Sequence, residues 1–368
     1  MQNAKITGVD VYICANPVKG NLADSSRKIE DIGYIIVDIS TDIGIHGIGL
    51  TYHEVGSEAI RNFIKFTIAP QIIGMSPLEN EVIYEKIFNF FRCVGRKGLA
   101  FCALSAVDIA LWDIKGKMAD MPLYRLLGGS NNKVPVYSSA GWTSHSTEVL
   151  CDEMLEMVEE GYTTIKMKVG VEGGSNFRED VKRVYAVRKA IGPDIRLAID
   201  ANNIWKAATA IQFASRVEEY DIDFFEEPVL ADDIPGLAHC RHSIKIPLAT
   251  GEHEYTRFGV RDLLMAEAVD IVQADACRVG GYTEMLKIIG MTQAFNVSFA
   301  PHCMELIHMH LVAAAPNGLI LEGLTLFRET AQNAFIDPPI PKNGILEIPE
   351  KPGLGLELNM EYINKYGI

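Results

Sequence analysis

The chain has 368 residues, of which 48% are hydrophobic, and its formal net charge at pH 7 is −14. This length allows a large core and about two domains, and the negative charge argues against nucleic-acid binding but not against a small anionic substrate. The N-terminus has no signal-like pattern, and no uncharged apolar run reaches the ~18 residues of a membrane span, so we expect a cytoplasmic protein without a membrane partner. Seven scattered cysteines without a CxxC pair indicate reduced thiols.

The first third of the chain is predicted to be an α+β unit. Three runs rich in β-branched residues predict a small antiparallel sheet, at 4–13, 33–40 and 45–51. The polar loop 17–28 between the first two strands is too long for a tight turn, so we expect it to act as a lid. Helical periodicity follows at 58–68, 78–90 and 98–118.

The rest of the chain alternates between strand-like and helix-like segments. The strand-like runs are 134–139, 163–169, 196–200, 224–229, 247–252, 271–276, 297–302 and 319–324. Helix-periodic segments separate most of them, for example 146–160, 177–191, 207–220, 282–295 and 304–314. This alternation predicts a parallel (β/α) barrel. The tail 327–368 is rich in proline and glycine, so we expect an extended segment laid back over the first unit.

Three acids end successive strand-like runs at equal steps. Asp200, Glu226 and Glu252 are separated by 226 − 200 = 252 − 226 = 26 residues, the step of a strand-helix unit. Their carboxylates should therefore lie side by side at the carboxyl edge of the parallel sheet. An all-oxygen set favours a hard cation, Mg²⁺ before Mn²⁺ or Ca²⁺.

Other strand ends carry groups suited to proton transfer. Lys166 and Lys168 alternate along one strand, so both can face the barrel axis, where mutual repulsion would lower an amine pKa and make one a base. Asp275 and His302 end neighbouring strands, so Asp275 can accept the ring N–H of His302 and orient it. Glu322 ends the eighth strand. The active site of such a barrel lies at this edge.

Lys168 and His302 are predicted to lie on opposite sides of the metal. A substrate carboxylate bound there would present its α-carbon to both bases. This arrangement suits abstraction of the α-proton, with the metal and hydrogen-bond donors stabilising an enediolate.

Two segments carry a resemblance to a known family. ALSAVDIALWDIKGKMADMPLYRLLGG (103–129), and LAIDANN with the later FFEEP, resemble signatures of the enolase superfamily, mandelate racemase subgroup. The resemblance covers nearly the whole chain. It implies an α/β protein in which an α+β capping domain (1–128) covers a modified (β/α)8 TIM-type barrel of (β/α)7β form (129–326), with a C-terminal segment (327–368) returning to the cap. It also implies a homo-oligomer.

The resemblance assigns the metal site residue by residue. It makes Asp200, Glu226 and Glu252 ligands of Mg²⁺, with Glu226 rather than Glu227 as the first acid of its pair. Asn202 matches a position that contacts substrate.

The same resemblance assigns the proton-transfer groups. Lys168 matches the base for S-configured carbons, and Lys166 matches its partner on the substrate carboxylate. Asp275 and His302 match the pair that serves the opposite face. Glu322 matches a carboxylic acid that hydrogen-bonds the enolate.

The resemblance leaves the reaction open between two classes. Most such relatives are hydro-lyases that convert an aldonate or aldarate to a 2-keto-3-deoxy acid, and a minority are racemases or epimerases of 2-hydroxy acids. The polar segment 16–28 and the motif GEHEYTR (251–257) favour the dehydratase. Tyr52 and His53 are candidates for substrate binding. A non-catalytic sugar-acid sensor is the third alternative.

Overall fold

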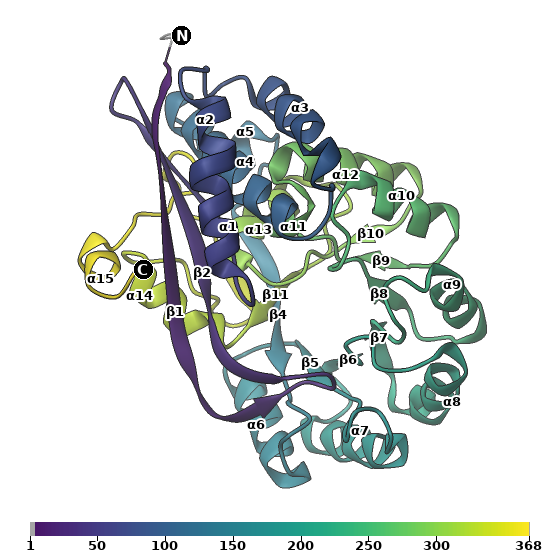
Figure 1. The fold of residues 1–368 in the computed structure, drawn as a ribbon. Coiled ribbons are helices and arrows are strands. Elements are labelled where there is room, and N and C mark those ends of the chain that lie inside the picture. Colours follow the sequence, from purple (N-terminus) through teal and green to yellow (C-terminus); the bar gives the residue numbers. More distant parts are fainter. Residues whose placement is uncertain (1–3, 368) are drawn as a thin grey trace.

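The computed structural model describes residues 4–367, and its first part is an antiparallel sheet with helices against it (Figure 1). The strands, in the order β1-β2-β3, are β1 (Ile6–Ala23), β2 (Lys28–Thr41) and β3 (His46–His53). The helices are α1 (Ser57–Phe63), α2 (Ala69–Ile72), α3 (Asn80–Phe90), α4 (Leu99–Met118) and α5 (Leu123–Leu126), with a π-helical segment, Ile64–Ile68, between α1 and α2. The predicted three strands and three helical segments are confirmed.

Two glycines let β3 approach α4 at backbone distance. A Cβ atom added at Gly49 would lie 1.8 Å from the carbonyl oxygen of Ala106, and one at Gly47 would lie 2.2 Å from that of Ala110. No side chain fits at such distances, so the sequence GIG at this point of β3 is a packing requirement.

The prediction of an irregular lid loop at 17–28 is wrong. β1 continues to Ala23 and β2 begins at Lys28, so most of the segment belongs to a long hairpin with a register irregularity between Pro17 and Leu22. The turn itself is closed by Asp24, whose Oδ1 accepts the backbone N–H groups of Ser26 (2.7 Å) and Arg27 (2.8 Å). Figure 1 shows this hairpin reaching the region of β5 and β6.

The second part is a ring of parallel strands surrounded by helices. The eight predicted strands are confirmed as β4 (Lys133–Ala140), β5 (Thr164–Lys168), β6 (Arg196–Asp200), β7 (Ile222–Glu226), β8 (Leu248–Thr250), β9 (Ile271–Val272), β10 (Ser298–Phe299) and β11 (Leu321–Leu324). They pair in the order β10-β9-β8-β7-β6-β5-β4-β11. Phe299 of β10 also bonds to Asn317 and Leu319, just before β11, which continues the ring.

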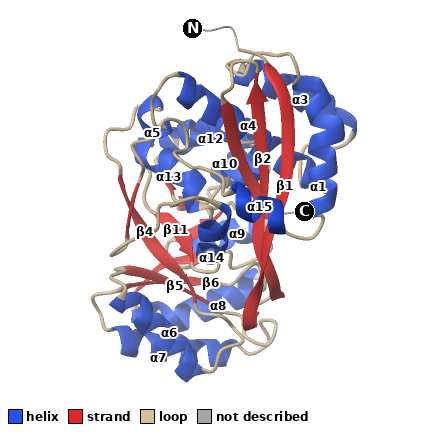
Figure 2. Ribbon diagram, turned by 90° about the vertical axis from the view of Figure 1, so that its left-hand side faces the viewer, coloured by secondary structure: helices blue, strands red, loops and turns tan. Residues whose placement is uncertain are grey.

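Helices lie outside this ring, as α6 and α7 do beside β5 and β6 in Figure 2. They are α6 (Thr147–Glu159), α7 (Phe177–Ile191), α8 (Ala207–Val217), α9 (Ile234–Ser243), α10 (Arg257–Met265), α11 (Ala276–Val279), α12 (Tyr282–Ala294) and α13 (Glu305–Ala314). The fold is therefore α/β, a modified (β/α)8 barrel with an α+β unit, as predicted. Within residues 4–367, no helix combines the length and apolar character that a bilayer crossing requires.

The tail contains more regular structure than its composition predicts. It forms α14 (Phe327–Ala334), β12 (Ile345–Glu347), which pairs antiparallel with β4, and α15 (Met360–Tyr366). The expectation of an extended segment is therefore wrong for both helices. α14 buries one face against β1 and β2, and the Tyr362 hydroxyl donates to Asn16 Oδ1 of β1 at 2.9 Å. The tail thus returns to the first sheet, while the domain limits at residues 128 and 326 stay a prediction.

Candidate active site

A cavity of about 560 Å³ lies between the first sheet and the carboxyl ends of the barrel strands. The hairpin and β3 contribute Arg27, Lys28, Asp31, Tyr52 and His53. The barrel contributes Trp142, Lys168, Asn202, Glu252, Arg278, His302 and Glu322. Every charged or amide group predicted at a strand end therefore lines this cavity or lies buried beneath it. Of the polar residues expected in the lid, Lys19 instead pairs with Glu329 on the surface, 3.2 Å away.

Asp200 and Glu226 occupy equivalent places on neighbouring strands. They are register partners at the ends of β6 and β7, and Glu252 follows β8 by two residues. All three are buried. Burial, then the charge of nearby Asp200, raises the pKa of Glu226 well above its ordinary value, and Glu322 and Glu252 add to the effect. The three predicted carboxylates therefore share one acid-rich region.

The two lysines of β5 point into this region, but their protonation differs from the prediction. Lys166 Nζ lies 2.6 Å from Glu226 and 2.8 Å from Glu322, and Lys168 Nζ lies 2.5 Å from Asp200. Burial disfavours both ammonium groups, yet these carboxylates outweigh it and raise both lysine pKa values. The predicted lowering is wrong for the protein without ligand, because Asp200 contacts the amine of Lys168 and carboxylates from three other strands surround the amine of Lys166.

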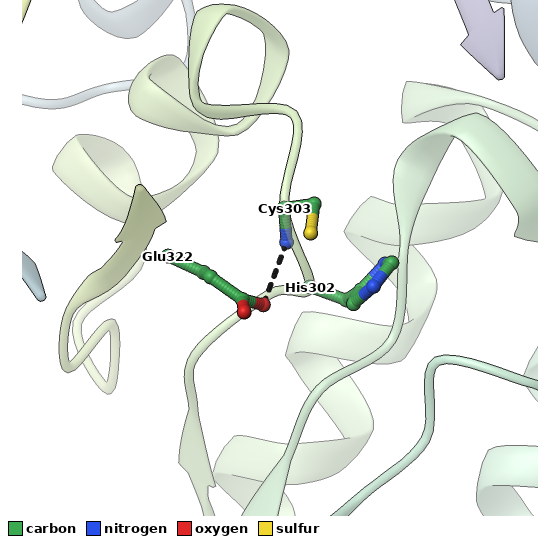
Figure 3. A group of neighbouring side chains, drawn as sticks. All are labelled: His302, Cys303 and Glu322. Carbon is green, nitrogen blue, oxygen red and sulfur yellow. Dashed lines mark hydrogen bonds between the residues drawn. The ribbon is translucent and has the colours of Figure 1, made fainter. Parts of the chain in front are cut away.

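Glu322 bridges β11 and the segment after β10. Its Oε1 pairs with Lys166, and its Oε2 accepts the backbone N–H of Cys303 at 3.0 Å (Figure 3). Burial opposes its ionisation, but Lys166 and His302 lower its pKa well below the ordinary range. Lys166 and His302 therefore favour the ionised form of Glu322 in the protein without ligand, and its role toward the enolate stays a prediction.

His302 and Asp275 form the predicted pair. His302 Nδ1 lies 3.0 Å from Asp275 Oδ2, and its Nε2 lies 3.5 Å from Glu252 Oε1. Burial opposes ionisation of Asp275, but its hydrogen bonds with histidines hold its pKa well below the ordinary range. Burial disfavours the imidazolium of His302, but Glu252 and Asp275 outweigh it and raise its pKa. His302 thus reaches the cavity from the segment after β10, which is not a neighbour of β5 in the strand order.

Of the four residues predicted to contact substrate, Asn202, Tyr52 and His53 line the cavity, whereas Lys166 is fully buried and is not part of its lining. The side-chain Nδ2 of Asn202 donates to Asp200 at 3.2 Å, and its Oδ1 is buried with no partner among residues 4–367. Tyr52 donates its hydroxyl proton to Asp275. His53 Nε2 lies 3.3 Å from Asp31 on the rim.

Several residues of the site were not predicted from the sequence. Glu227 is buried beside the predicted ligands, and its carboxylate binds Asn203 Nδ2 and, at 2.9 Å, His253 Nδ1. Burial and Glu252 raise the pKa of Glu227 to about 7. Arg278 lines the cavity one helical turn after Asp275. The doubled acid in FFEE and the histidine in GEHEYTR are the signals from which the Glu227–His253 pair could have been predicted.

The donor set fits a divalent cation. Oxygen ligands from aspartate and glutamate suit hard cations such as Mg²⁺. The buried Oδ1 of Asn202 and Oε1 of Gln273 have no donor among residues 4–367, which leaves acceptors available. Within residues 4–367, two groups have all their ligand atoms within 4.8 Å of one another: Glu227, Glu252 and His253, and His302, Cys303 and Glu322. The predicted set of Asp200, Glu226 and Glu252 is not one of these groups, so its role as a ligand set stays a prediction.

Known protein families and relatives match most of the chain. Residues 8–128 match the mandelate racemase/muconate lactonizing enzyme N-terminal domain, and residues 149–362 match the enolase C-terminal domain-like family. The chain is 32% identical over 361 residues, 96% of each sequence, to an arabinonate dehydratase of Saccharolobus solfataricus.

Two solved structures illustrate the similarity in space. A racemase from Streptomyces coelicolor with bound magnesium has a TM-score of 0.93 at 28% identity, covering 99% of this chain and 100% of that one. The L-talarate/galactarate dehydratase of Salmonella typhimurium with Mg and L-lyxarohydroxamate has a TM-score of 0.92 at 30% identity, covering 100% and 93%. Curated relatives near this identity also include cycloisomerases and a racemase.

Proposed function

Because the chain belongs to the mandelate racemase/muconate lactonizing enzyme subgroup of the enolase superfamily, we propose that it dehydrates an acid sugar, an aldonate or an aldarate, to a 2-keto-3-deoxy acid. The observation that carries the proposal is the placement of Lys168 and His302 on two sides of one acid-rich cavity. Such a pair can remove a proton and deliver a proton on opposite faces of a substrate carbon.

Asp200, Glu226 and Glu252 would hold Mg²⁺ in this proposal. The all-oxygen donor set and the Mg-containing relatives support the choice of metal. When bound, the ion would stabilise the negative charge that develops on the substrate carboxylate as the α-proton leaves. Lys166 lies between Glu226 and Glu322, so its ammonium group would add positive charge on the same side.

Lys168 and His302 would divide the proton transfers. For one C2 configuration, neutral Lys168 takes the proton from C2, and the imidazolium of His302 gives a proton to the departing C3 hydroxyl, which leaves as water. The resulting enol then tautomerises to the 2-keto-3-deoxy acid. For the opposite C2 configuration, the two residues exchange these roles.

Lys168 can act as a base only if its amine is neutral. Its ion pair with Asp200, 2.5 Å long, favours the charged amine. The proposal therefore requires Asp200 to be engaged as a metal ligand before Lys168 can accept a proton.

The polar groups on the cavity wall favour a substrate with several hydroxyl groups. Arg27, Asp31, His53, Asn202 and Arg278 present polar groups to it. Hydroxyl groups need such partners, because a buried hydroxyl without a hydrogen bond is unfavourable.

Racemisation or epimerisation of a 2-hydroxy acid is the second candidate. It uses the same two bases, and a racemase is among the structural relatives. A non-catalytic sugar-acid sensor is a third, but a sensor has no need of two proton-transfer groups facing one cavity.

A screen of aldonates and aldarates with Mg²⁺ tests the proposal. Formation of a 2-keto-3-deoxy acid supports it, and interconversion of C2 epimers without loss of water supports the racemase. Binding without turnover of any acid would favour the sensor and contradict both enzymatic proposals.

A further inference from the structure

Tyr52 joins the first sheet to the His302–Asp275 pair. It stands on β3, and its hydroxyl oxygen contacts both members of the pair, although neither belongs to its own sheet. We propose that Tyr52 is a positioning residue, which holds Asp275 and His302 in the orientation that leaves His302 Nε2 open to the substrate. This inference rests on the proposed function, because it concerns the His302 half of the proposed chemistry.

The three groups form a closed triangle of hydrogen bonds. The hydroxyl of Tyr52 donates to Asp275 Oδ2, and His302 Nδ1 lies 3.0 Å from that same oxygen and 3.0 Å from the Tyr52 hydroxyl oxygen. The other carboxylate oxygen, Oδ1, accepts the backbone N–H of Cys277 at 2.7 Å. Both oxygens of Asp275 therefore accept hydrogen bonds. Removing the Tyr52 hydroxyl would take away one of the two partners of Asp275 Oδ2 and one of the two partners of His302 Nδ1.

The triangle also fixes where the protons lie. The Tyr52 hydroxyl has one proton, which it donates to Asp275, so its oxygen can only accept from His302. Both neighbours of Nδ1 are then acceptors, and Nδ1 must carry a proton. The neutral imidazole therefore keeps its lone pair on Nε2, the nitrogen near Glu252 that faces the cavity.

Tyr52 has the rigidity that a positioning role requires. The residue is 6% exposed, the guanidinium of Arg278 lies 4.7 Å from its ring centroid, and the rings of His302 and Phe327 lie 5.7 and 5.9 Å away. Burial raises the pKa of the hydroxyl well above its ordinary value, so it keeps its proton. Because that proton goes to Asp275, it is not available to a substrate hydroxyl.

The test compares Tyr52→Phe with Tyr34→Phe in the Mg²⁺-loaded enzyme. Tyr34 is the register partner of Tyr52 on β2 and is also buried, but its hydroxyl meets the Phe327 carbonyl and not the pair. We expect Tyr52→Phe to lose about 10- to 100-fold in kcat with little change in KM, the usual effect of removing a group that orients a histidine. Tyr34→Phe should keep wild-type rates.

The pattern of lost steps distinguishes positioning from general damage. Dehydration and exchange of the C2 hydrogen with deuterated solvent are measured for Tyr52→Phe, His302→Asn and Lys168→Ala. Tyr52→Phe should reproduce the pattern of His302→Asn in weaker form and leave steps that depend on Lys168 intact. Equal loss of both sets of steps, a rise in KM alone, or wild-type behaviour would overturn the inference.

Crystal structures of the wild type and of Tyr52→Phe supply a readout without turnover. We expect the 3.0 Å contact between His302 Nδ1 and Asp275 Oδ2 to be broken or the ring to rotate in the variant. An unchanged pair would overturn the inference even if the enzyme is active. If the wild type turns over no acid sugar, the proposed function fails, while these structures still decide the role of Tyr52.

Discussion

Lys168 approaches the cavity from β5, whereas His302 approaches from the segment after β10. Each side chain has its own carboxylate partner, Asp200 for the lysine and Asp275 for the histidine. Two independently supported groups can perform two separable steps on one substrate.

We therefore predict different phenotypes for Lys168→Ala and His302→Asn. For a substrate whose C2 proton Lys168 removes, Lys168→Ala should lower both dehydration and C2 hydrogen exchange by about 10²- to 10⁴-fold. His302→Asn should lower dehydration by a similar factor but retain exchange, since proton removal does not need the acid. NMR in deuterated solvent measures exchange, and keto-acid formation measures dehydration. Retained dehydration in both variants would remove these residues from the mechanism.

At the scale of elements, the contact of β3 with α4 depends on glycine. We predict that Gly49→Ala lowers the free energy of unfolding by at least 1–3 kcal/mol, roughly the cost of overpacking, because its Cβ would meet the Ala106 carbonyl. Gly290→Ala in α12 is the matched control: nothing lies within 4 Å of an added Cβ, and alanine should stabilise the helix by about 0.5–1 kcal/mol. Urea unfolding measures both. Equal stability of the two variants would contradict the prediction.

His310 ties α13 to α5 and to the tail. Its Nδ1 accepts the backbone N–H of Tyr124 at 3.1 Å, and its Nε2 lies 3.1 Å from the Leu354 carbonyl oxygen. Burial lowers the pKa of His310 from 6.5 to about 4. Between pH 4 and 6.5, the folded protein therefore keeps this histidine neutral, whereas the unfolded chain binds a proton on it.

The sign of the pH effect follows from that difference. Well above pH 6.5 the group is neutral in both states, and as the pH falls from 6.5 to 4.5 the unfolded state gains about 2 kcal/mol relative to the folded state. We predict that His310→Gln, which does not titrate, is less stable than the wild type at pH 7.5 but loses about 2 kcal/mol less between pH 6.5 and 4.5. Urea unfolding across this range measures it, and parallel pH profiles would refute it.

The barrel strands could be predicted from the sequence because their signal is local. Each strand is a short apolar run that ends in a polar residue, and equal spacing placed Asp200 beside Glu226. The hairpin beyond Pro17 was missed because its pairing is with residues across the turn, and Pro17 and Gly20 interrupt the local pattern. α14 was missed because its apolar face is defined by β1 and β2, hundreds of residues earlier.

The position of the site residues could be predicted from the sequence, but the protonation of the two lysines could not. Asp275 and His302 were paired correctly because neighbouring strand ends meet. The lysine pKa values were predicted in the wrong direction because the acids that surround Lys166 come from β7 and β11, and sequence order does not show which carboxylates approach an amine. Arg278 carried no signal beyond its position after Asp275.

At the scale of the whole molecule, activity should depend on a divalent cation. We predict that EDTA abolishes turnover and that Mg²⁺ restores it, because the proposed ligands Asp200, Glu226 and Glu252 offer only oxygen. Assays before and after metal removal test this, with thermal unfolding as a control for loss of fold. Full activity in stringently metal-free protein would contradict the metal assignment.

We also expect the protein to assemble into a symmetric homo-oligomer, on family resemblance alone. Light scattering combined with size-exclusion chromatography measures the mass in solution. A mass near the 40.6 kDa of one chain would contradict this expectation.

The tip of the β1–β2 hairpin is fastened to the barrel at two points. Thr143, after β4, donates through its backbone N–H to the Ala23 carbonyl at 2.9 Å, and the Ser25 hydroxyl donates to the Ala201 carbonyl, just after β6, at 2.7 Å. Moving the tip away from the barrel would break both hydrogen bonds. The hairpin is therefore a fixed wall of the cavity, anchored next to both β4 and β6, rather than a loose flap over it.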